Sequence, residues 1–287
     1  MARVAFLGNC QSLPMQALTR NLCSDVTVIE MLPVHLMKPK DLLDAVDRCE
    51  QADVIIHQPL GGTFGPIAST SLRATLPNKT FVSFPSIYFG GLFPQLTYLR
   101  QPDGPVLWGP VNDYHDARII AAYLASESTE TCLERVLDDD PAMISFFEKA
   151  FEDSVAKERG CDVKSMDVMM SMMPSGSPLY TFNHPRNAVL WTVIERAFQH
   201  AGLGLPDGAP VLPEREFLSN TRAAIPSTIP KSLGHAWRRP EYSLWEDAKP
   251  MPELIKEYYE LYDTIADFPA LCRHNAYRFN IEVKIPD

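Results

Sequence analysis

The stretch Val4-Ala5-Phe6-Leu7-Gly8-Asn9-Cys10-Gln11 begins as a continuous apolar run and ends in small and polar residues. Such a run is typical of a strand that is buried on both faces in a parallel sheet. Ser12 and Pro14 follow, and these residue types favour the N-cap and the first turn of a helix. We therefore expect Cys10 to lie at the end of a strand, beside a helix N-terminus. The unpaired N–H groups and the positive dipole end there favour a thiolate, so Cys10 is a candidate nucleophile.

The same alternation of strand and helix continues as far as residue 84. Further apolar runs predict strands at residues 26–29, 54–56 and 81–84. Helical patterns are found in three segments. The first follows Ser12, with Leu13, Ala17, Leu18 and Leu22 inward, and the second begins at Asp41, with Leu42, Leu43 and Val46 inward. The third covers residues 65–76. This order predicts an α/β fold with one parallel sheet and right-handed crossovers. Loops at the carboxyl ends of such strands meet at one rim, where ligands bind. The expected rim residues are Cys10, His57, Gln58 and Ser86.

The rest of the chain reads as a helical part followed by a proline-rich part. Helices are predicted at residues 113–125, 130–137, 141–158 (with Pro141 in the first turn), 187–200 and 253–265, and a short strand at 179–182. Met166 to Met173 suits adaptable core packing. Residues 202–252 are rich in proline and glycine and are expected to wrap the surface. We expect a single α/β domain over residues 1–287, with a parallel core (1–100), a helical part (101–201) and a C-terminal extension (202–287).

Composition excludes several classes of protein. The formal net charge of -10 argues against nonspecific nucleic-acid binding, because such binding needs an excess of cations. No signal peptide and no apolar stretch long enough to span a bilayer is recognised, so we expect a cytoplasmic protein without a membrane span. The six cysteines are scattered without CxxC spacing, which favours reduced thiols over disulfides or a zinc site, and no metal is expected.

Two histidines are candidate partners for Cys10. His184 lies in the turn Asn183-His184-Pro185, where its ring can point into a cleft and where polar Asn183 is adjacent. His57 ends a predicted strand at the rim, but a core histidine at a strand end is a slightly better interpretation. Gln58 can donate its amide to an oxyanion, as can the backbone N–H groups of Cys10 and Gln11.

Cationic residues offer contacts for an anionic ligand such as a pyrophosphate. Guanidinium groups suit phosphate oxygens, and a solvated surface is the alternative. The candidates are Arg186, Lys231, Arg238 and Arg239, with His57 as a further candidate contact for the cofactor and Trp237 available to stack on a base. Asp116 and Asp167 are possible partners that orient a histidine. The GxSxG, P-loop, GxGxxG and HExxH motifs are absent.

Four segments, taken in order, resemble the WcbI-type polysaccharide biosynthesis family of acetyltransferases. They are Gly8-Asn9-Cys10-Gln11, His57-Gln58-Pro59, residues 85–91 (PSIYFGG), and residues 180–185 (YTFNHP). The resemblance implies a fold related to the SGNH (GDSL-like) hydrolases, flavodoxin-like in its parallel core, with cysteine in place of serine. It also implies binding of coenzyme A and acetylation of capsular or exopolysaccharide sugars.

By this resemblance Cys10 matches the nucleophile and His184 the base, while Asn9, Gln11 and Gln58 match polar positions around them. The sequence departs from a standard SGNH enzyme at Thr181, where an acid would precede the histidine by three residues. A cysteine–histidine pair can suffice, because a thiol needs less activation than a hydroxyl.

Three functions remain open from the sequence. The first is acyl transfer from acetyl-coenzyme A to a glycan hydroxyl through Cys10 and His184. The second is an esterase or thioesterase that uses water as the acceptor. The third is a noncatalytic component that binds coenzyme A or a glycan. Tyr88, Phe89 and Phe93 suggest an apolar wall that would exclude water, although core packing explains these rings equally well.

Overall fold

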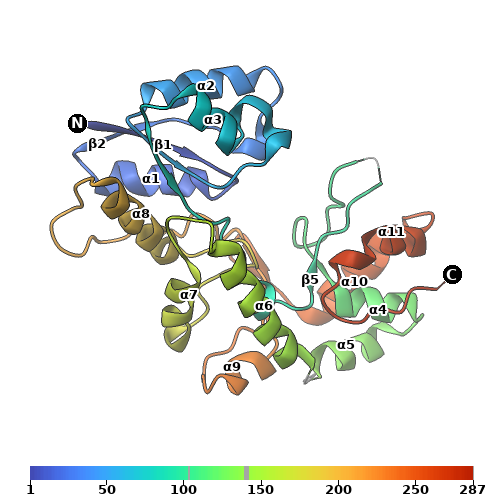
Figure 1. Ribbon diagram of the computed structural model, residues 1–287. Helices are drawn as coiled ribbons and strands as arrows, with labels where there is room; N and C mark the ends of the chain where they lie inside the picture. Colours follow the sequence, from blue (N-terminus) through green and yellow to red (C-terminus); the bar gives the residue numbers. More distant parts are fainter. Residues whose placement is uncertain (103, 139–141, 287) are drawn as a thin grey trace. The chain divides into compact units, whose positions relative to one another are not determined.

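A four-stranded parallel sheet forms at the start of the chain in a computed structural model that describes residues 1–102, 104–138 and 142–286 (Figure 1). Its strands are β1 (Ala2–Leu7), β2 (Val26–Ile29), β3 (Val54–His57) and β4 (Thr80–Ser83). Their order is β2-β1-β3-β4, and every neighbouring pair is parallel. The predicted α/β class is therefore confirmed, and the strand order is that of flavodoxin-like sheets. Pro141, predicted for the first turn of a helix, lies outside the described residues.

The chain divides into two compact units, each assembled from three separate stretches. The first comprises Met1–Tyr88, Asp153–Leu179 and Asn183–Leu218, and the second comprises Phe89–Glu152, Tyr180–Phe182 and Ser219–Asp287. The single domain expected from the sequence stays a prediction.

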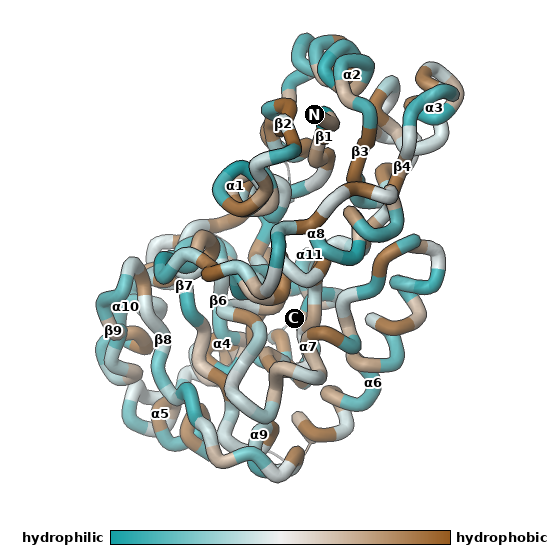
Figure 2. The backbone as a smooth tube through the Cα atoms, turned by 90° about the vertical axis from the view of Figure 1, so that its left-hand side faces the viewer, coloured by the Kyte–Doolittle hydropathy of each residue, from teal (hydrophilic) through white to brown (hydrophobic). Residues whose placement is uncertain are grey.

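Helices cover both faces of the sheet in the first unit. On one face, α2 (Asp41–Gln51) and α3 (Ser69–Thr75) pack on side chains that alternate along the strands, such as Leu7 and Ile55. On the other face lies α1 (Ser12–Leu22), which contacts α8 (Asn187–Ala201), and α8 in turn contacts β4 (Figure 1). Burial on both faces explains the continuous apolar runs of β1 and β3, and β3 is drawn largely in brown in Figure 2.

Local details differ from the sequence patterns at three positions. Ser12 is the first residue of α1 rather than its cap, and its hydroxyl donates to the Asn9 carbonyl. Leu13 and Leu43, both expected to point inward, are 46% and 68% exposed. The α1 stripe instead buries polar Gln16 and Thr19, whose burial a hydropathy pattern does not indicate.

The predicted helix over residues 65–76 is also interrupted. A 3-10 turn, η2 (Gly62–Ile67), precedes α3. Gly65 has φ 56°, a left-handed conformation that favours glycine and ends a regular helix.

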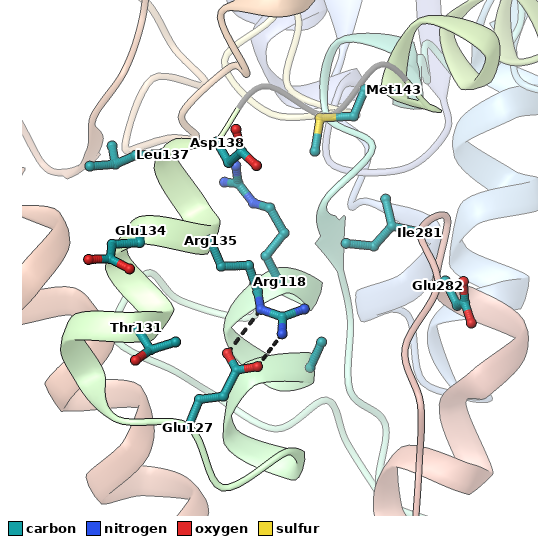
Figure 3. A pocket seen from close by; sticks show the side chains of 11 residues that line it. Arg118, Glu127, Thr131, Glu134, Arg135, Leu137, Asp138, Met143, Ile281 and Glu282 are labelled. Carbon is teal, nitrogen blue, oxygen red and sulfur yellow. Dashed lines mark hydrogen bonds and ion pairs between the residues drawn. The ribbon is translucent and has the colours of Figure 1, made fainter.

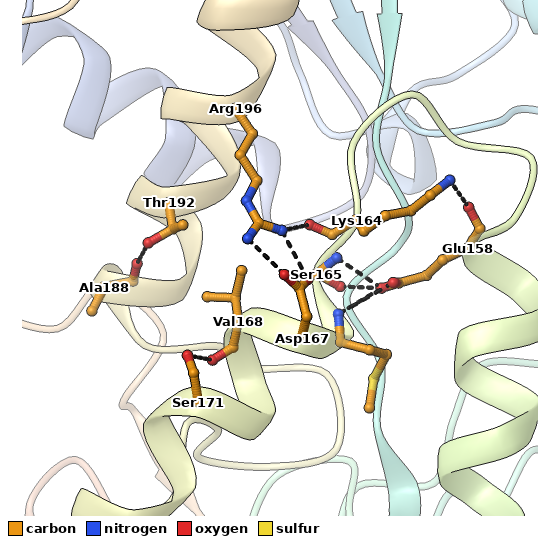
Figure 4. A network of polar contacts seen from close by, with 10 residues as sticks. Glu158, Lys164, Ser165, Asp167, Val168, Ser171, Ala188, Thr192 and Arg196 are labelled. Atoms are coloured by element: carbon orange, nitrogen blue, oxygen red, sulfur yellow. Dashed lines mark hydrogen bonds and ion pairs between the residues drawn. The ribbon is translucent and has the colours of Figure 1, made fainter.

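The remaining helices of the first unit are joined through a buried carboxylate. The end of α6 (Ala142–Glu158) brings Glu158 to the N-terminus of α7 (Met166–Met172), where it accepts bonds from Ser165 and from the Met166 N–H at 3.1 Å (Figure 4). A carboxylate at a helix N-terminus satisfies orphan donors and complements the dipole. Met166, Met169 and Met173 are buried, as expected for core methionines.

The second unit contains short strands and an aromatic core. Its elements are β5 (Leu96–Thr97), β6 (His115–Asp116), α4 (Ala117–Leu124), α5 (Thr129–Leu137), β7 (Thr221–Arg222), α9 (Thr228–Ser232), β8 (Tyr242–Leu244), β9 (Asp247–Lys249), α10 (Met251–Asp263) and α11 (Phe268–Asn275). β5 pairs with β6, and β7-β8-β9 form an antiparallel sheet. In the core, the rings of Tyr262 and Phe268 stack at 4.1 Å. Residues 202–252, expected only to wrap the surface, thus contribute regular elements to this unit.

The segment 179–182 forms an isolated bridge, Leu179 with Pro185, instead of the predicted short strand. Within residues 1–102, 104–138 and 142–286, no helix is both long enough and apolar enough to cross a membrane. The same ranges hold no group of three His, Cys, Asp or Glu side chains that could bind a metal ion.

Candidate active site

The loop after β1 is held in place by the residue that follows β3. Asn9 donates its backbone N–H to Gln58 Oε1 at 2.9 Å, and Gln58 Nε2 donates to Asn9 Oδ1 at 3.2 Å. Gly8 permits this approach, because a Cβ at that position would lie 2.9 Å from Gln58 Oε1. The strand order reverses between β1 and β3, and ligands bind at such a point in open α/β sheets. The loop that carries Cys10 therefore occupies the expected binding position.

Gln11 ties this loop to two distant segments of the first unit. Its side chain is fully buried, and its Nε2 donates to the carbonyls of Ile87 at 2.7 Å and Asn183 at 2.9 Å. Its Oε1 accepts from the Ile87 N–H and from Gln58 Nε2, both at 3.0 Å. Asn9 adds a bond from Nδ2 to the Ser86 hydroxyl at 2.9 Å. These bonds join Asn9, Gln11, Gln58 and Asn183, four predicted site residues, in one network.

This network brings the neighbours of the two predicted catalytic residues into contact. Gln11 follows Cys10 and Asn183 precedes His184, so the bond of 2.9 Å between Gln11 and Asn183 links the cysteine loop to the histidine turn. The rim position of Cys10, Gln58 and Ser86 agrees with the parallel sheet. The catalytic roles of Cys10 and His184 stay predictions.

Cys10 differs from the other five cysteines in its exposure. It is half-buried, whereas Cys23, Cys49, Cys132, Cys161 and Cys272 are buried. Burial raises the pKa of the Cys49 thiol to about 12 and that of the Cys23 thiol to about 11. The expectation that most cysteines fill the core is confirmed. No acidic residue lies in the first turn of α1 to offset its positive end near Cys10.

A hydrogen bond to the backbone of Leu218 contributes to the orientation of His184. Burial lowers its pKa to about 4, while a hydrogen bond to the backbone of Leu218 opposes that shift. Asn187, the first residue of α8, holds the segment before Leu218: its Nδ2 donates to the Arg215 carbonyl at 2.9 Å, and its Oδ1 accepts from the Phe217 N–H at 3.2 Å. The ring is therefore neutral at pH 7. Sequence reasoning missed Leu218, because a backbone partner has no side-chain signature.

The two carboxylates considered as histidine partners bind arginines instead. In the second unit, Asp116 accepts from Arg118 Nη2 at 2.7 Å and from the Tyr242 hydroxyl at 2.8 Å. In the first, Asp167 forms a bidentate pair with Arg196 at 2.8 and 2.7 Å. Both therefore have structural partners.

His57 is buried against α3. Its Nδ1 lies 3.0 Å from the Gln58 carbonyl and 3.3 Å from the Ser69 hydroxyl, and its Nε2 lies 3.5 Å from Arg73. Burial lowers its pKa. These contacts match the alternative of a core histidine at a strand end, and a role for His57 in cofactor binding stays a prediction.

The predicted cationic contacts are divided between the two units. Arg186 is exposed in the first unit, two residues after His184. Lys231 and Arg238 are exposed in the second unit, where the Arg239 guanidinium lies 5.3 Å from the centre of the Phe93 ring. In the same segment, Trp237 stacks on His235 at 6.3 Å. Their role in binding an anion stays a prediction.

A cavity of about 830 Å³ in the second unit is lined by paired arginines and by acidic side chains (Figure 3). Its two arginines are already paired, Arg118 with Asp116 and Arg135 with Glu127. Glu134 and Glu282 add negative charge to the lining. This cavity therefore does not suit a phosphate-containing ligand.

The strand order and the cysteine loop define an α/β protein with a polar site at the switch point of its sheet. A solved structure of WcbI, described as a novel polysaccharide biosynthesis enzyme, shares this fold with a TM-score of 0.77. The sequence identity is 20%, and the match covers 97% of this chain and 96% of that chain. That structure is described as the native protein without a disulfide bond between coenzyme A and one of its cysteines. No curated protein matches the chain.

The family model described as "Polysaccharide biosynthesis enzyme WcbI" matches residues 3–206, well over half of the chain. This chain belongs to the WcbI family of polysaccharide biosynthesis enzymes. The family expected from the Gly8–Gln11 and Asn183–Pro185 segments is thus confirmed.

Proposed function

We propose that this protein transfers an acyl group, acetyl in the simplest case, from coenzyme A to a sugar hydroxyl during polysaccharide biosynthesis. The family supports the pathway, and the coenzyme A and cysteine named for the solved WcbI structure support the donor. The observation that carries the proposal is the bond between Gln11 and the Asn183 carbonyl, since it ties the loop of Cys10 to the turn of His184.

In the first step, Cys10 Sγ attacks the carbonyl carbon of the acyl thioester, and its proton passes to the ring of His184. The bond from that carbon to the sulfur of coenzyme A breaks, and the departing sulfur takes the proton from the imidazolium. The acyl group is then a thioester on Cys10. Exchange between two sulfurs is nearly balanced in energy, so this step needs no other reactant.

In the second step, a sugar hydroxyl loses its proton to His184 and attacks the acyl carbon. The bond to Cys10 Sγ breaks, and the thiolate recovers the proton. The lowered pKa of His184 keeps the ring neutral at pH 7, which is the form that accepts a proton, and the hydrogen bond to the backbone of Leu218 supports its orientation.

The contacts of the loop narrow the choice of hydrogen-bond donors for the tetrahedral oxyanion. Both amide hydrogens of Gln58 are directed at Asn9 and Gln11, and the Gln11 N–H donates to Asn9 Oδ1 at 3.0 Å. Asn9 Nδ2 uses one hydrogen for Ser86. We assign its second hydrogen to the oxyanion, and such a donor is worth about 3 kcal/mol. The Cys10 N–H stays a donor expected from the sequence. Gln11 and Gln58 then act as positioning residues.

Coenzyme A also needs contacts for its phosphates. Arg186 suits this role because it is exposed and lies two residues from His184. Lys231, Arg238 and Arg239 lie in the second unit, and their role in binding an anion stays a prediction.

Mass spectrometry of the Cys10 peptide after incubation with acetyl-coenzyme A tests the function. We expect acetylation of that peptide, and product analysis with glycan acceptors should show acetyl sugar. Cys10→Ala should abolish both. Cys23→Ala is the matched control, because this buried thiol lies at the opposite end of α1. Acetate as the sole product would favour a hydrolase. Full transfer by Cys10→Ala would remove the mechanism, and binding without any chemistry would favour a noncatalytic component.

A further inference from the structure

An exposed aromatic ring lies next to the segment that is bound to the cysteine loop. Of the three rings considered as an apolar wall, Phe89 and Phe93 are fully buried in the second unit. Tyr88, the last residue of its stretch in the first unit, is 41% exposed. Core packing accounts for the two phenylalanines but does not account for the tyrosine.

The position of Tyr88 is fixed by the same network that holds Cys10. Ile87 uses both its N–H and its carbonyl for bonds to the Gln11 side chain, at 3.0 and 2.7 Å. Ser86 accepts from Asn9 Nδ2 at 2.9 Å. The backbone immediately before Tyr88 is therefore attached to the loop that presents the proposed nucleophile.

A lysine from α6 lies over the Tyr88 ring. Lys157 Nζ is 5.9 Å from the ring centre, within the range of a cation–π contact. The Lys157 side chain is exposed. The neighbouring Glu158 is turned inward toward Ser165 and Met166. Lys157 thus adds an exposed positive charge beside an accessible aromatic ring.

We propose that Tyr88 and Lys157 bind the acceptor, and that this acceptor is a saccharide with a negative charge. A tyrosine ring offers an apolar face for the C–H groups of a sugar and has few rotatable bonds to immobilise. The ammonium pairs with a carboxylate or a phosphate as a point charge. This inference rests on the proposed function only in making the bound saccharide the acceptor, because the binding of an anionic sugar can be measured without turnover.

Calorimetric titration of the full chain tests the inference with three probes: a disaccharide that contains glucuronate, its neutral glucose counterpart, and glucose 1-phosphate. We expect the unsubstituted protein to bind the anionic probes more tightly than the neutral one. Lys157→Met should weaken binding of the anionic probes about tenfold, as for loss of a bond to a charged group, and leave the neutral probe unchanged. Tyr88→Ala should weaken all three, and Tyr88→Phe should retain binding.

Lys40→Met is the matched control, because Lys40 is an exposed lysine of the same unit that precedes α2. Preference for glucuronate or for the phosphate identifies the source of the charge. Equal binding of neutral and anionic probes, or equal effects of Lys157→Met and Lys40→Met, would overturn the inference. Loss of the anionic preference in Lys157→Met without any acetylation of Cys10 would support the saccharide site while refuting the proposed transfer.

Discussion

Substitution of Gln11 by alanine probes the network that supports the proposed active site. The Gln11 side chain is fully buried and makes four hydrogen bonds, to Ile87 twice, to Asn183 and to Gln58. Each such bond contributes about 1 kcal/mol net, so Gln11→Ala should lower the free energy of unfolding by about 4 kcal/mol. Gln16→Ala is a matched control, because this buried glutamine makes two bonds of 3.0 Å to Met31 and should cost about 2 kcal/mol.

Urea unfolding of the three proteins measures these differences, and the rate at which iodoacetamide alkylates Cys10 gives a local readout. We expect Gln11→Ala to alkylate several-fold faster than the unsubstituted protein, because local opening exposes the loop. Gln16→Ala should alkylate at the original rate. Equal losses of stability for both variants, or an unchanged alkylation rate in Gln11→Ala, would refute the reasoning.

Two further predictions concern stability. Burial lowers the pKa of His115 and His184 from 6.5 to about 4. As the pH falls from 6.5 to about 4, the unfolded chain binds protons that the folded chain does not bind, so the free energy of unfolding decreases. Fully buried His115 should account for about 3 kcal/mol of this loss, and urea midpoints at pH 7 and pH 4.5 measure it; a flat dependence contradicts it. Glu158→Gln should lower the free energy of unfolding by about 2 kcal/mol, because a buried carboxylate that binds Ser165 and Met166 loses its charge. Asp167→Asn, at an exposed pair with Arg196, should cost at most about 1 kcal/mol in the same titration, and equal costs would count against a special role for Glu158.

The parallel sheet could be predicted because its strands carry a strong local signal. A strand such as β3 is buried on both faces, so Val54, Ile55 and Ile56 form an unbroken apolar run. Strand ends are then fixed as well, which places Cys10 and Gln58 at one rim before any contact is known. The segments around Cys10 and His184 also resembled a family that the match over residues 3–206 confirms.

The parts that could not be predicted depend on contacts between distant residues. Gln11 and Asn183 are separated by 172 positions, and nothing local marks their bond. His184 forms a hydrogen bond to the backbone of Leu218. Because every residue has the same backbone groups, the sequence does not mark this contact. α11 (Phe268–Asn275) was missed because a helix of eight residues gives little periodicity. Burial of Gln16 likewise arises from its two bonds to Met31.

The discontinuous first unit has a consequence for how the protein emerges from the ribosome. α8, which packs on α1 and β4, is translated roughly a hundred residues after the sheet that it covers. At about 5–20 residues per second, the part of that face that α1 leaves uncovered waits on the order of ten seconds for α8. During that interval its apolar side chains are open to chaperones or to other nascent chains, so slowing translation before Asn187 should reduce the yield of native protein.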